Sequence, residues 1–458
     1  MEGLPLGMSF RGRLTLVVRP ARPANVGAMR LAPWLPRAAA LRGDRAALEL
    51  PGERVTYAEL EAGARAVAGA LAARGAGEGD VVALDLPPGR DLVTALHGCA
   101  LLGAVAMPVD PRLTGRERAA RLRGTAAVLD GPADPGSAAR GPAFRPRAAD
   151  PLLVVHTSGT TGDPLPVTLS HGNVLANALG SAVALGLDPA ERWLCPLPLS
   201  HVGGLMVLLR SVVYGTTAVV EPPPFDADRV AGLLGAGAVT VASLVPTMLA
   251  RVLDAGVEPA PALRRVLLGG APAAPALLAR ARDAGVPVSA TYGLTQACSQ
   301  VTVAEPGDLE TSGHPLPGVE VAIAADGEIV VGGPTVAGGG PLATGDLGRL
   351  DDRGRLVVIG RKSDTIVTGG ENVAPAEVEA VLLEHPGVAD AGVVGRPDPE
   401  WGEAVTAIVV ARDGRLDPGE LRAFCAARLA RFKVPKAIVL APELPRSPSG
   451  KLRRGELG

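Results

Sequence analysis

The stretch Val154-Val155-His156-Thr157-Ser158-Gly159-Thr160-Thr161-Gly162-Asp163-Pro164 joins an apolar run to a loop of glycine and small hydroxyl residues. The apolar run, Leu152 to Val155, predicts a buried strand. In the loop, glycines let backbone N–H groups close on an anion, and hydroxyls add donors without bulk or charge. The stretch therefore predicts either a phosphate-binding loop or a polar linker. It is not a Walker A loop, because no Gly-Lys-Ser/Thr follows the required four-residue spacer.

The composition indicates a folded globular protein. The 458 residues are too many for one ordinary core, so two or three domains are expected. Hydrophobic residues make up 47% and charged residues 20%. The net charge of −2 gives no overall positive field for nucleic acid, and an aromatic content of 2% leaves few rings for base stacking. We therefore expect no nucleic-acid partner.

The cysteines and the most apolar stretch suggest a cytoplasmic protein without an integral membrane segment. Cys99, Cys195, Cys298 and Cys425 are scattered without a CxxC pair, which is typical of reduced thiols. The apolar stretch 92–109 is interrupted by polar residues and is too broken for a membrane span, so it predicts a buried helix followed by a strand. Residues 1–28 carry no secretory signal, and we interpret them as a disordered tail or a misassigned start upstream of Met29.

The first 270 or so residues alternate between helical and strand patterns, which predicts α/β layers with parallel sheets. Helices are expected at Ala58–Arg74 and Asp91–Leu102. The expected strands are Val81–Leu86, Val105–Val109, Val128-Leu129, Leu152–Val155, Trp193–Leu197, Ala218–Val220, Val239–Ala242 and Val266–Leu268. Residues 131–149 are rich in Pro, Gly and Ala and predict a surface loop.

The pattern changes near residue 319. Three short alternating runs broken by Gly and Asp predict a small antiparallel unit: Val319–Ile323, Gly327–Val331 and Arg355–Ile359. The charged segment 361–364 then predicts a linker. Beyond it we expect a helix at Pro375–Leu383, strands at Ala391–Val394 and Ala404–Val410, and a second helix at Pro418–Leu429. We therefore expect a large N-terminal domain over 29–360, a hinge at 361–364 and a small α+β domain over 365–458.

Six motifs in this order resemble the adenylate-forming superfamily of acyl-CoA synthetases, peptide-synthetase adenylation domains and luciferases. They are Thr157–Gly162, Thr291-Tyr292-Gly293-Leu294-Thr295, Thr344-Gly345-Asp346, Gly360-Arg361, Gly369-Gly370-Glu371-Asn372 and Ser449-Gly450-Lys451. The resemblance covers about residues 40–455. It implies the superfamily's fold, in which an α/β N-terminal domain with a small β unit precedes a mobile C-terminal domain.

Within that superfamily the chain most resembles the o-succinylbenzoate–CoA ligases of menaquinone biosynthesis. Four stretches carry this likeness: 195–204 (CPLPLSHVGG), 211–215 (SVVYG), 269–272 (GGAP) and 292–301 (YGLTQACSQV). The resemblance implies an acid–thiol ligase that uses ATP, Mg²⁺ and coenzyme A. It would adenylate the acid with release of diphosphate and then form the thioester with release of AMP. The implied partners are these small molecules, and a homo-oligomer is left open.

The resemblance assigns a role to individual residues. Lys451 would bridge the carboxylate and the α-phosphate, with His201 and Thr295 as further catalytic residues, and His201 would also line the acyl pocket and gate thiol entry. The nucleotide-binding residues implied are Thr157, Ser158, Gly159, Thr160, Thr161, Gly162, Gly269, Gly270, Ala271, Thr291, Tyr292, Gly293, Asp346 and Arg361. Gly370 would contact substrate, and Gln296 and Thr157 would face the metal. Taken singly, such residues are more often solvated lysines, turn aspartates, surface ion pairs or core histidines.

Two positions depart from the superfamily pattern. The phosphate loop usually continues with a lysine where this chain has Leu165, so one positive charge near the β- and γ-phosphates is missing. Gln296 stands where the family has a glutamate for Mg²⁺, and a neutral amide is the weaker ligand for a hard cation. Both changes concern nucleotide and metal handling, not the acyl pocket.

Arg210 has two readings. It ends the apolar run Leu205–Leu209 that follows His201, so it either reaches solvent or a surface acid, or it faces the acyl pocket. The o-succinylbenzoate ligases carry a basic residue at this place, and their substrate has a second carboxylate that a guanidinium would match in charge and geometry. We therefore assign Arg210 to that carboxylate as a hypothesis.

Three alternatives stay open at this point. The chain could be another acyl- or aryl-CoA synthetase, or an acyl-adenylate binder weakened at Leu165 and Gln296. Retention of Lys451, Asp346 and Arg361 argues against such decay. A peptide-synthetase adenylation domain would require an acidic residue for the substrate amine and a carrier domain after residue 458.

Overall fold

The computed structural model describes residues 29–132, 144–157, 165–446 and 452–457. A seven-stranded sheet forms one layer, with the strand order β12-β11-β10-β8-β9-β1-β2. Its strands are β1 (Ala46–Leu50), β2 (Glu53–Thr56), β8 (Arg192–Cys195), β9 (Thr217–Val220), β10 (Val241–Leu244), β11 (Arg265–Leu268) and β12 (Val288–Ala290). All neighbours are parallel except β2, which pairs antiparallel with β1. Every residue of β9 and β10 is buried, as expected for parallel strands covered on both faces.

A second sheet of five strands has the order β5-β3-β4-β6-β7. Its strands are β3 (Val81–Leu84), β4 (Val105–Pro108), β5 (Ala127–Leu129), β6 (Pro151–His156) and β7 (Pro166–Ser170). The first four strands are parallel, and β7 returns antiparallel to β6. The predicted strand Leu152–Val155 is therefore confirmed as β6. The hairpin closes where the Thr157 N–H donates to the Leu165 carbonyl at 3.0 Å.

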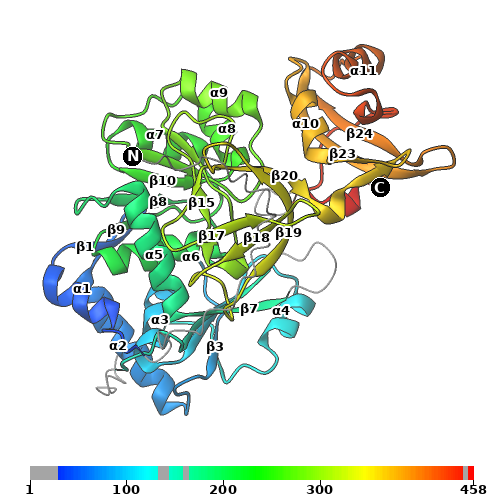
Figure 1. Ribbon diagram of the computed structural model, residues 1–458. Coiled ribbons are helices and arrows are strands. Elements are labelled where there is room, and N and C mark those ends of the chain that lie inside the picture. The colour runs from blue at the N-terminus through cyan, green and yellow to red at the C-terminus, as the bar shows by residue number, and fades with distance from the viewer. Residues whose placement is uncertain (1–28, 133–143, 158–164, 447–451, 458) are drawn as a thin grey trace, which may run out of the picture.

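Helices fill the space between the two sheets and cover their outer faces. They are α1 (Trp34–Arg42), α2 (Tyr57–Ala73), α3 (Arg90–Leu102), α4 (Gly115–Leu122), α5 (His171–Leu185), α6 (Val202–Tyr214), α7 (Ala227–Gly235), α8 (Pro246–Asp254) and α9 (Pro275–Asp283). One core cluster combines side chains of α2, α3 and α6 with side chains of both sheets, so these helices lie between the layers (Figure 1). A second cluster packs α7, α8 and α9 against the other face of the seven-stranded sheet.

The antiparallel region after residue 290 is larger than the sequence predicted. Two short hairpins pair β13 (Gly293–Leu294) with β14 (Ser299–Gln300) and β15 (Thr302–Val303) with β16 (His314–Pro315), and the 3-10 helix η3 (Thr295–Ala297) lies inside the first. A four-stranded sheet then runs β17 (Glu320–Ile323), β18 (Glu328–Gly332), β19 (Leu342–Leu350) and β20 (Leu356–Arg361). Strand β19 was not predicted, and Arg361, expected in the linker, is the last residue of β20.

The C-terminal elements form a separate sheet with its own core. The strands are β21 (Ile366–Thr368), β22 (Glu371–Val373), β23 (Val388–Asp398), β24 (Gly402–Ala411) and β25 (Ala437–Leu440). The helices are α10 (Pro375–Leu383) and α11 (Pro418–Ala426), with 3-10 turns η4 (Lys362–Asp364), η5 (Arg431–Lys433) and η6 (Arg454–Glu456). These elements extend beyond the end of β20 (Figure 1). None of the helices in the described ranges is long and apolar enough to cross a membrane.

Candidate active site

Two of the predicted nucleotide-binding motifs meet where β11 and β12 end. The Thr291 N–H donates to the Leu268 carbonyl at 2.9 Å, and a Cβ on Gly269 would lie 2.9 Å from the Thr291 methyl carbon. Gly270 has φ +82°, a conformation that favours glycine. The two glycines therefore let the backbone after β11 run directly against the start of the Thr291–Thr295 motif, with Ala271 half-buried beside it.

Asp346 lies at the centre of a partly buried polar cluster. The Tyr292 hydroxyl donates to Asp346 Oδ2 at 2.7 Å, and Arg361 Nε lies 2.8 Å from Asp346 Oδ1. The pairing of β19 with β20 places Asp346 opposite Arg361, and the Thr344 hydroxyl accepts the Asp346 N–H at 3.1 Å. Burial and the Asp346 charge raise the pKa of Tyr292, so this hydroxyl stays a donor. Three predicted site residues from distant segments thus form one connected cluster.

His201 lies at the N-terminus of α6 against two residues that the sequence did not single out. Its Nε2 is 3.8 Å from Asp110 Oδ2 and 3.4 Å from Arg112 Nη2. Arg112 also pairs with Asp110 through two nitrogens, at 2.8 and 2.5 Å. Burial raises the pKa of Asp110, but the hydrogen bonds from Arg112 outweigh it and lower the pKa overall. In the sequence, the signal that could have identified Asp110 and Arg112 is the Asp-Pro-Arg segment directly after the strand predicted at Val105–Val109.

Arg210 is buried, so the reading in which it reaches solvent or a surface acid is wrong. Its side chain on α6 is 3% exposed, and Nη2 donates to Asn177 Oδ1 on α5. The guanidinium carbon lies 5.5 Å from the centroid of the Trp193 ring. Burial lowers the pKa of this guanidinium.

The Thr295–Ala297 turn places the remaining residues of that motif. Thr295 and Gln296 are half-buried in η3, and the Gln296 carbonyl accepts the Ala337 N–H at 2.7 Å. Cys298 and Ser299 follow with φ of 56° and 84°, which is strained for residues that carry a Cβ. This tight return brings Ser299 and Gln300 back against Gly293 and Leu294.

Several predicted residues lie apart from this cluster or outside the described ranges. Ser158, Gly159, Thr160, Thr161, Gly162 and Lys451 are outside the described residues. Thr157 is described, and its hydroxyl accepts the Leu165 N–H at 3.2 Å, while the Leu165 side chain is 66% exposed. Gly370 lies in the C-terminal sheet, at the turn between β21 and β22.

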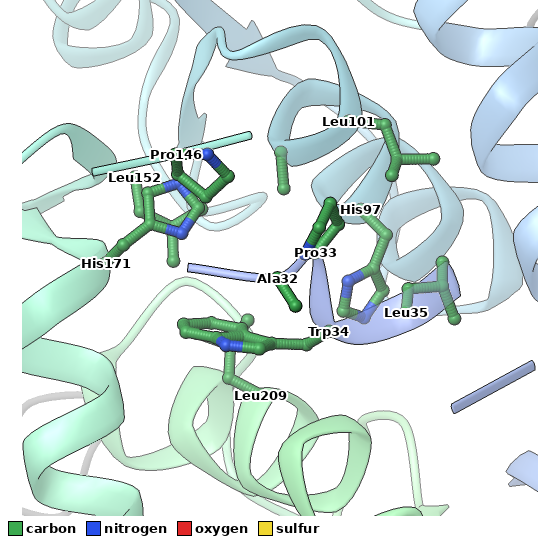
Figure 2. A pocket seen from close by; sticks show the side chains of 11 residues that line it. Ala32, Pro33, Trp34, Leu35, His97, Leu101, Pro146, Leu152, His171 and Leu209 are labelled. Carbon is green, nitrogen blue, oxygen red and sulfur yellow. The ribbon is translucent and has the colours of Figure 1, made fainter. Parts of the chain in front are cut away.

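A small cavity of about 20 Å³ lies away from all these motifs. Figure 2 shows His97 and His171 among its lining residues, with Trp34 and Leu209 on its other side. The volume is that of a water molecule, and no predicted site residue lines it. We therefore do not assign the nucleotide or the acid to this cavity.

Comparisons with known proteins agree with this arrangement of motifs. Residues 35–129 and 130–339 match the AMP-binding enzyme family, and residues 377–451 match the AMP-binding enzyme C-terminal domain. The chain is 37% identical to the 2-succinylbenzoate–CoA ligase of Bacillus thuringiensis subsp. konkukian over 93% of this chain and 97% of the relative.

Solved structures of the o-succinylbenzoate-CoA synthetase of Bacillus subtilis are also similar, at 35% identity. The complex with the acyl-adenylate intermediate superposes with a TM-score of 0.86 over 94% of this chain and 98% of that one. The complex with ATP and magnesium ion also gives 0.86, over 94% and 100%. With two matched domains and full-length relatives, the chain belongs to the AMP-binding enzyme family.

Proposed function

We propose that the protein is an acid–thiol ligase of menaquinone biosynthesis that converts 2-succinylbenzoate, ATP and coenzyme A into 2-succinylbenzoyl-CoA, AMP and diphosphate. The observation that carries the proposal is the Tyr292–Asp346–Arg361 cluster beside the Gly269–Thr291 contact, in a chain that matches 2-succinylbenzoate–CoA ligases along nearly its whole length. It places a carboxylate, an arginine and exposed backbone together, which suits a ribose and its phosphate.

The reaction has two steps with different needs. A carboxylate oxygen attacks the α-phosphorus, the bond to diphosphate breaks, and the acid becomes an acyl-adenylate. The thiol sulfur of coenzyme A then attacks the acyl carbon, its proton passes to solvent, and AMP leaves. The first step brings two anions together and therefore requires cations and donors aimed at the developing charge. We assign the bridging cation of this step to Lys451.

Described contacts support two of the nucleotide roles that we assign. One carboxylate oxygen of Asp346 accepts a hydrogen bond from Tyr292, and the other pairs with Arg361. Each oxygen retains a further lone pair that can accept from a ribose hydroxyl. Arg361, 42% exposed at its side chain, can turn toward a phosphate without leaving β20. We place Thr157 to Gly162 at the phosphates and the backbone of Gly269 to Ala271 against the adenine.

Magnesium would be held largely through the nucleotide. Among the described residues no group of three or more His, Cys, Asp and Glu could hold a metal ion. Thr157 and Gln296 offer neutral oxygens, which fit an ion that arrives bound to the phosphates of ATP. When bound, Mg²⁺ would neutralise phosphate charge during adenylation.

We assign Arg210 to the non-reacting carboxylate of the substrate. Its guanidinium is buried, and His201, at the N-terminus of the same helix, lies about 13 Å away along the axis at the usual rise. Arg210→Ala should lower kcat/KM for 2-succinylbenzoate by roughly 2–5 kcal/mol, as for a charge left unpaired, and leave KM for ATP nearly unchanged. Unaltered use of 2-succinylbenzoate by the variant would contradict the assignment.

The test of the overall function is carboxylate-dependent AMP release. Purified protein is assayed with 2-succinylbenzoate beside benzoate, a medium-chain and a long-chain fatty acid. We expect 2-succinylbenzoate to give the highest kcat/KM. A preference for a fatty acid would support another acyl-CoA synthetase. Binding of acyl-adenylate without turnover of any acid would support the alternative of an acyl-adenylate-binding protein that has lost catalysis. Leu165 and Gln296 favour that alternative, because each replaces a charged residue of the family pattern.

We also infer a reducing, cytoplasmic location. All four cysteines are buried free thiols, and burial raises the pKa of each of them. Such thiols are unreactive and persist where disulfides do not form. Whether copies of the chain associate is a separate question that sedimentation would answer.

A further inference from the structure

Arg210 is a buried cation without a carboxylate partner in the described part of the chain. Its contacts there are the Asn177 amide oxygen and the Trp193 ring, and its Nε has no hydrogen-bond partner. The sulfur atoms of Cys298 and Met206, 3.8 Å apart, lie on the same side of α6. Burying a guanidinium without a counter-ion costs free energy, so an anion bound beside Arg210 would be stabilised.

Asn177 is oriented by a second hydrogen bond. It is fully buried on α5, and its Nδ2 donates to the Gln300 carbonyl at 2.8 Å. A carbonyl can only accept, so this bond fixes the amide with its nitrogen toward Gln300 and its oxygen toward Arg210. The side chain thus links β14 to α6 and has no freedom to turn.

An amide at position 177 does what a carboxylate of the same shape would not do. Aspartate would hold the guanidinium equally well, but it would also neutralise it. Asparagine holds the guanidinium and leaves its charge available. Gln300, whose backbone carbonyl holds Asn177, is 3% exposed, and within the described ranges neither atom of its side-chain amide has a hydrogen-bond partner.

We propose that Asn177 is a positioning residue for substrate selection: it fixes the Arg210 guanidinium and, because it is neutral, reserves the charge for the second carboxylate of a dicarboxylic acid. The inference rests on the proposed function and deepens it. It explains selectivity against monocarboxylic acids, since these would leave the buried guanidinium uncompensated.

The experiment is a selectivity ratio in matched variants. Asn177→Asp supplies an internal counter-ion, and Asn177→Ala removes the anchor without adding charge. For each variant, kcat/KM is measured with 2-succinylbenzoate and with benzoate, together with KM for ATP and the thermal midpoint. We expect the ratio of the two kcat/KM values to fall at least about tenfold in Asn177→Asp and less in Asn177→Ala, with KM for ATP unchanged.

The control is Asn173→Asp, the same change one turn earlier on α5. Asn173 bonds to Ser170 and to the carbonyls of Pro334 and Val336, not to Arg210. This control should keep the wild-type ratio. Because aspartate at 177 would also face the Gln300 carbonyl, Asn177→Ala keeps the inference testable if Asn177→Asp does not fold.

The outcomes separate the two proposals. If wild type does not turn over 2-succinylbenzoate, the proposed function fails, whatever the variants do. If wild type uses it and the folded variants keep the ratio, the inference about Asn177 is overturned. An equal loss with both acids would also overturn it, because that is the signature of a general structural defect.

Discussion

Gln296 is one of the two residues at which we expect this chain to depart from the family pattern. It sits half-buried in η3, with its backbone carbonyl held by the Ala337 N–H. Gln296→Glu should lower the Mg²⁺ concentration for half-maximal adenylation and raise the rate, because a charged oxygen is the stronger ligand. A Mg²⁺ titration of wild type and variant measures both. Slower adenylation by the variant at every Mg²⁺ concentration would show that the amide is adapted to this site.

Lys451 lies outside the described residues, so its role is tested by kinetics alone. In the role proposed for it, its charge is needed where carboxylate and α-phosphate approach each other, and not when the thiol attacks a neutral acyl group. Lys451→Ala should therefore slow adenylation on the order of 10²–10³-fold and spare thioester formation from supplied acyl-adenylate. The two half-reactions are assayed separately, and equal losses in both would argue against the assignment.

At the scale of elements, two arginine–carboxylate pairs flank the segment that carries Lys451. Arg446 bonds Asp390 on β23 at 3.0 and 2.6 Å, and Arg454 bonds both oxygens of Glu379 on α10 at 2.6 Å. Between them, Arg446 and Leu452 form an isolated antiparallel bridge. The described residues Arg446 and Arg454 are therefore fixed to β23 and α10.

Glu379→Gln should weaken the second pair and slow adenylation more than thioester formation. Arg454 Nη2 donates to both Glu379 oxygens at 2.6 Å, and an amide at 379 would leave this guanidinium without part of its partner, so the C-terminal elements should lose about 1–3 kcal/mol of stability. Thermal unfolding and the two half-reactions are the measurements. The matched control is Glu377→Gln on the same helix, which breaks only the exposed pair with Lys433. If both variants behave alike, the pair has no special part in adenylation.

The sequence predicted elements better than it predicted contacts. The alternation of helix and strand is confirmed in β3, α3 and β4, whereas the strand expected at Val239–Ala242 lies at Val241–Leu244. Strand β19 was missed because Gly345 and Gly348 interrupt its pattern, although a Cβ at Gly348 would lie 2.8 Å from the Val357 carbonyl. Asn177 could not be found from motifs, because its partners Arg210 and Gln300 lie far away along the chain. Asp110 and Arg112 pair with each other, but their contact with His201 joins segments 89 residues apart.

At the scale of the whole molecule, two buried histidines tie stability to pH. His97 and His171 are each 4% exposed, and burial lowers the pKa of each to about 4. The folded protein keeps them neutral, while the unfolded chain protonates them below about pH 6.5. The stability that follows from keeping them neutral is therefore fully present above that pH. As the pH falls toward 4, the free energy of unfolding decreases by at most about 3 kcal/mol for each histidine.

Urea unfolding of wild type and His97→Leu between pH 7.5 and 4.5 measures this contribution. The variant should lose less free energy of unfolding than wild type over the same range, because it has one fewer group to protonate. Since carboxylates titrate equally in both proteins, the difference between the two curves isolates His97. Parallel curves would show that this histidine does not contribute.

The separate core of the C-terminal elements has a consequence for how such enzymes diverge. Its buried members all lie between Ile366 and Val434, whereas His201, Asn177 and Arg210 belong to the layers that precede it. If the proposed roles hold, substitutions that change which acid is accepted fall in one folding unit, and substitutions around Lys451 fall in another. Recombination near residues 361–364 would therefore exchange the segment that carries Lys451 while leaving Asn177 and Arg210 in place.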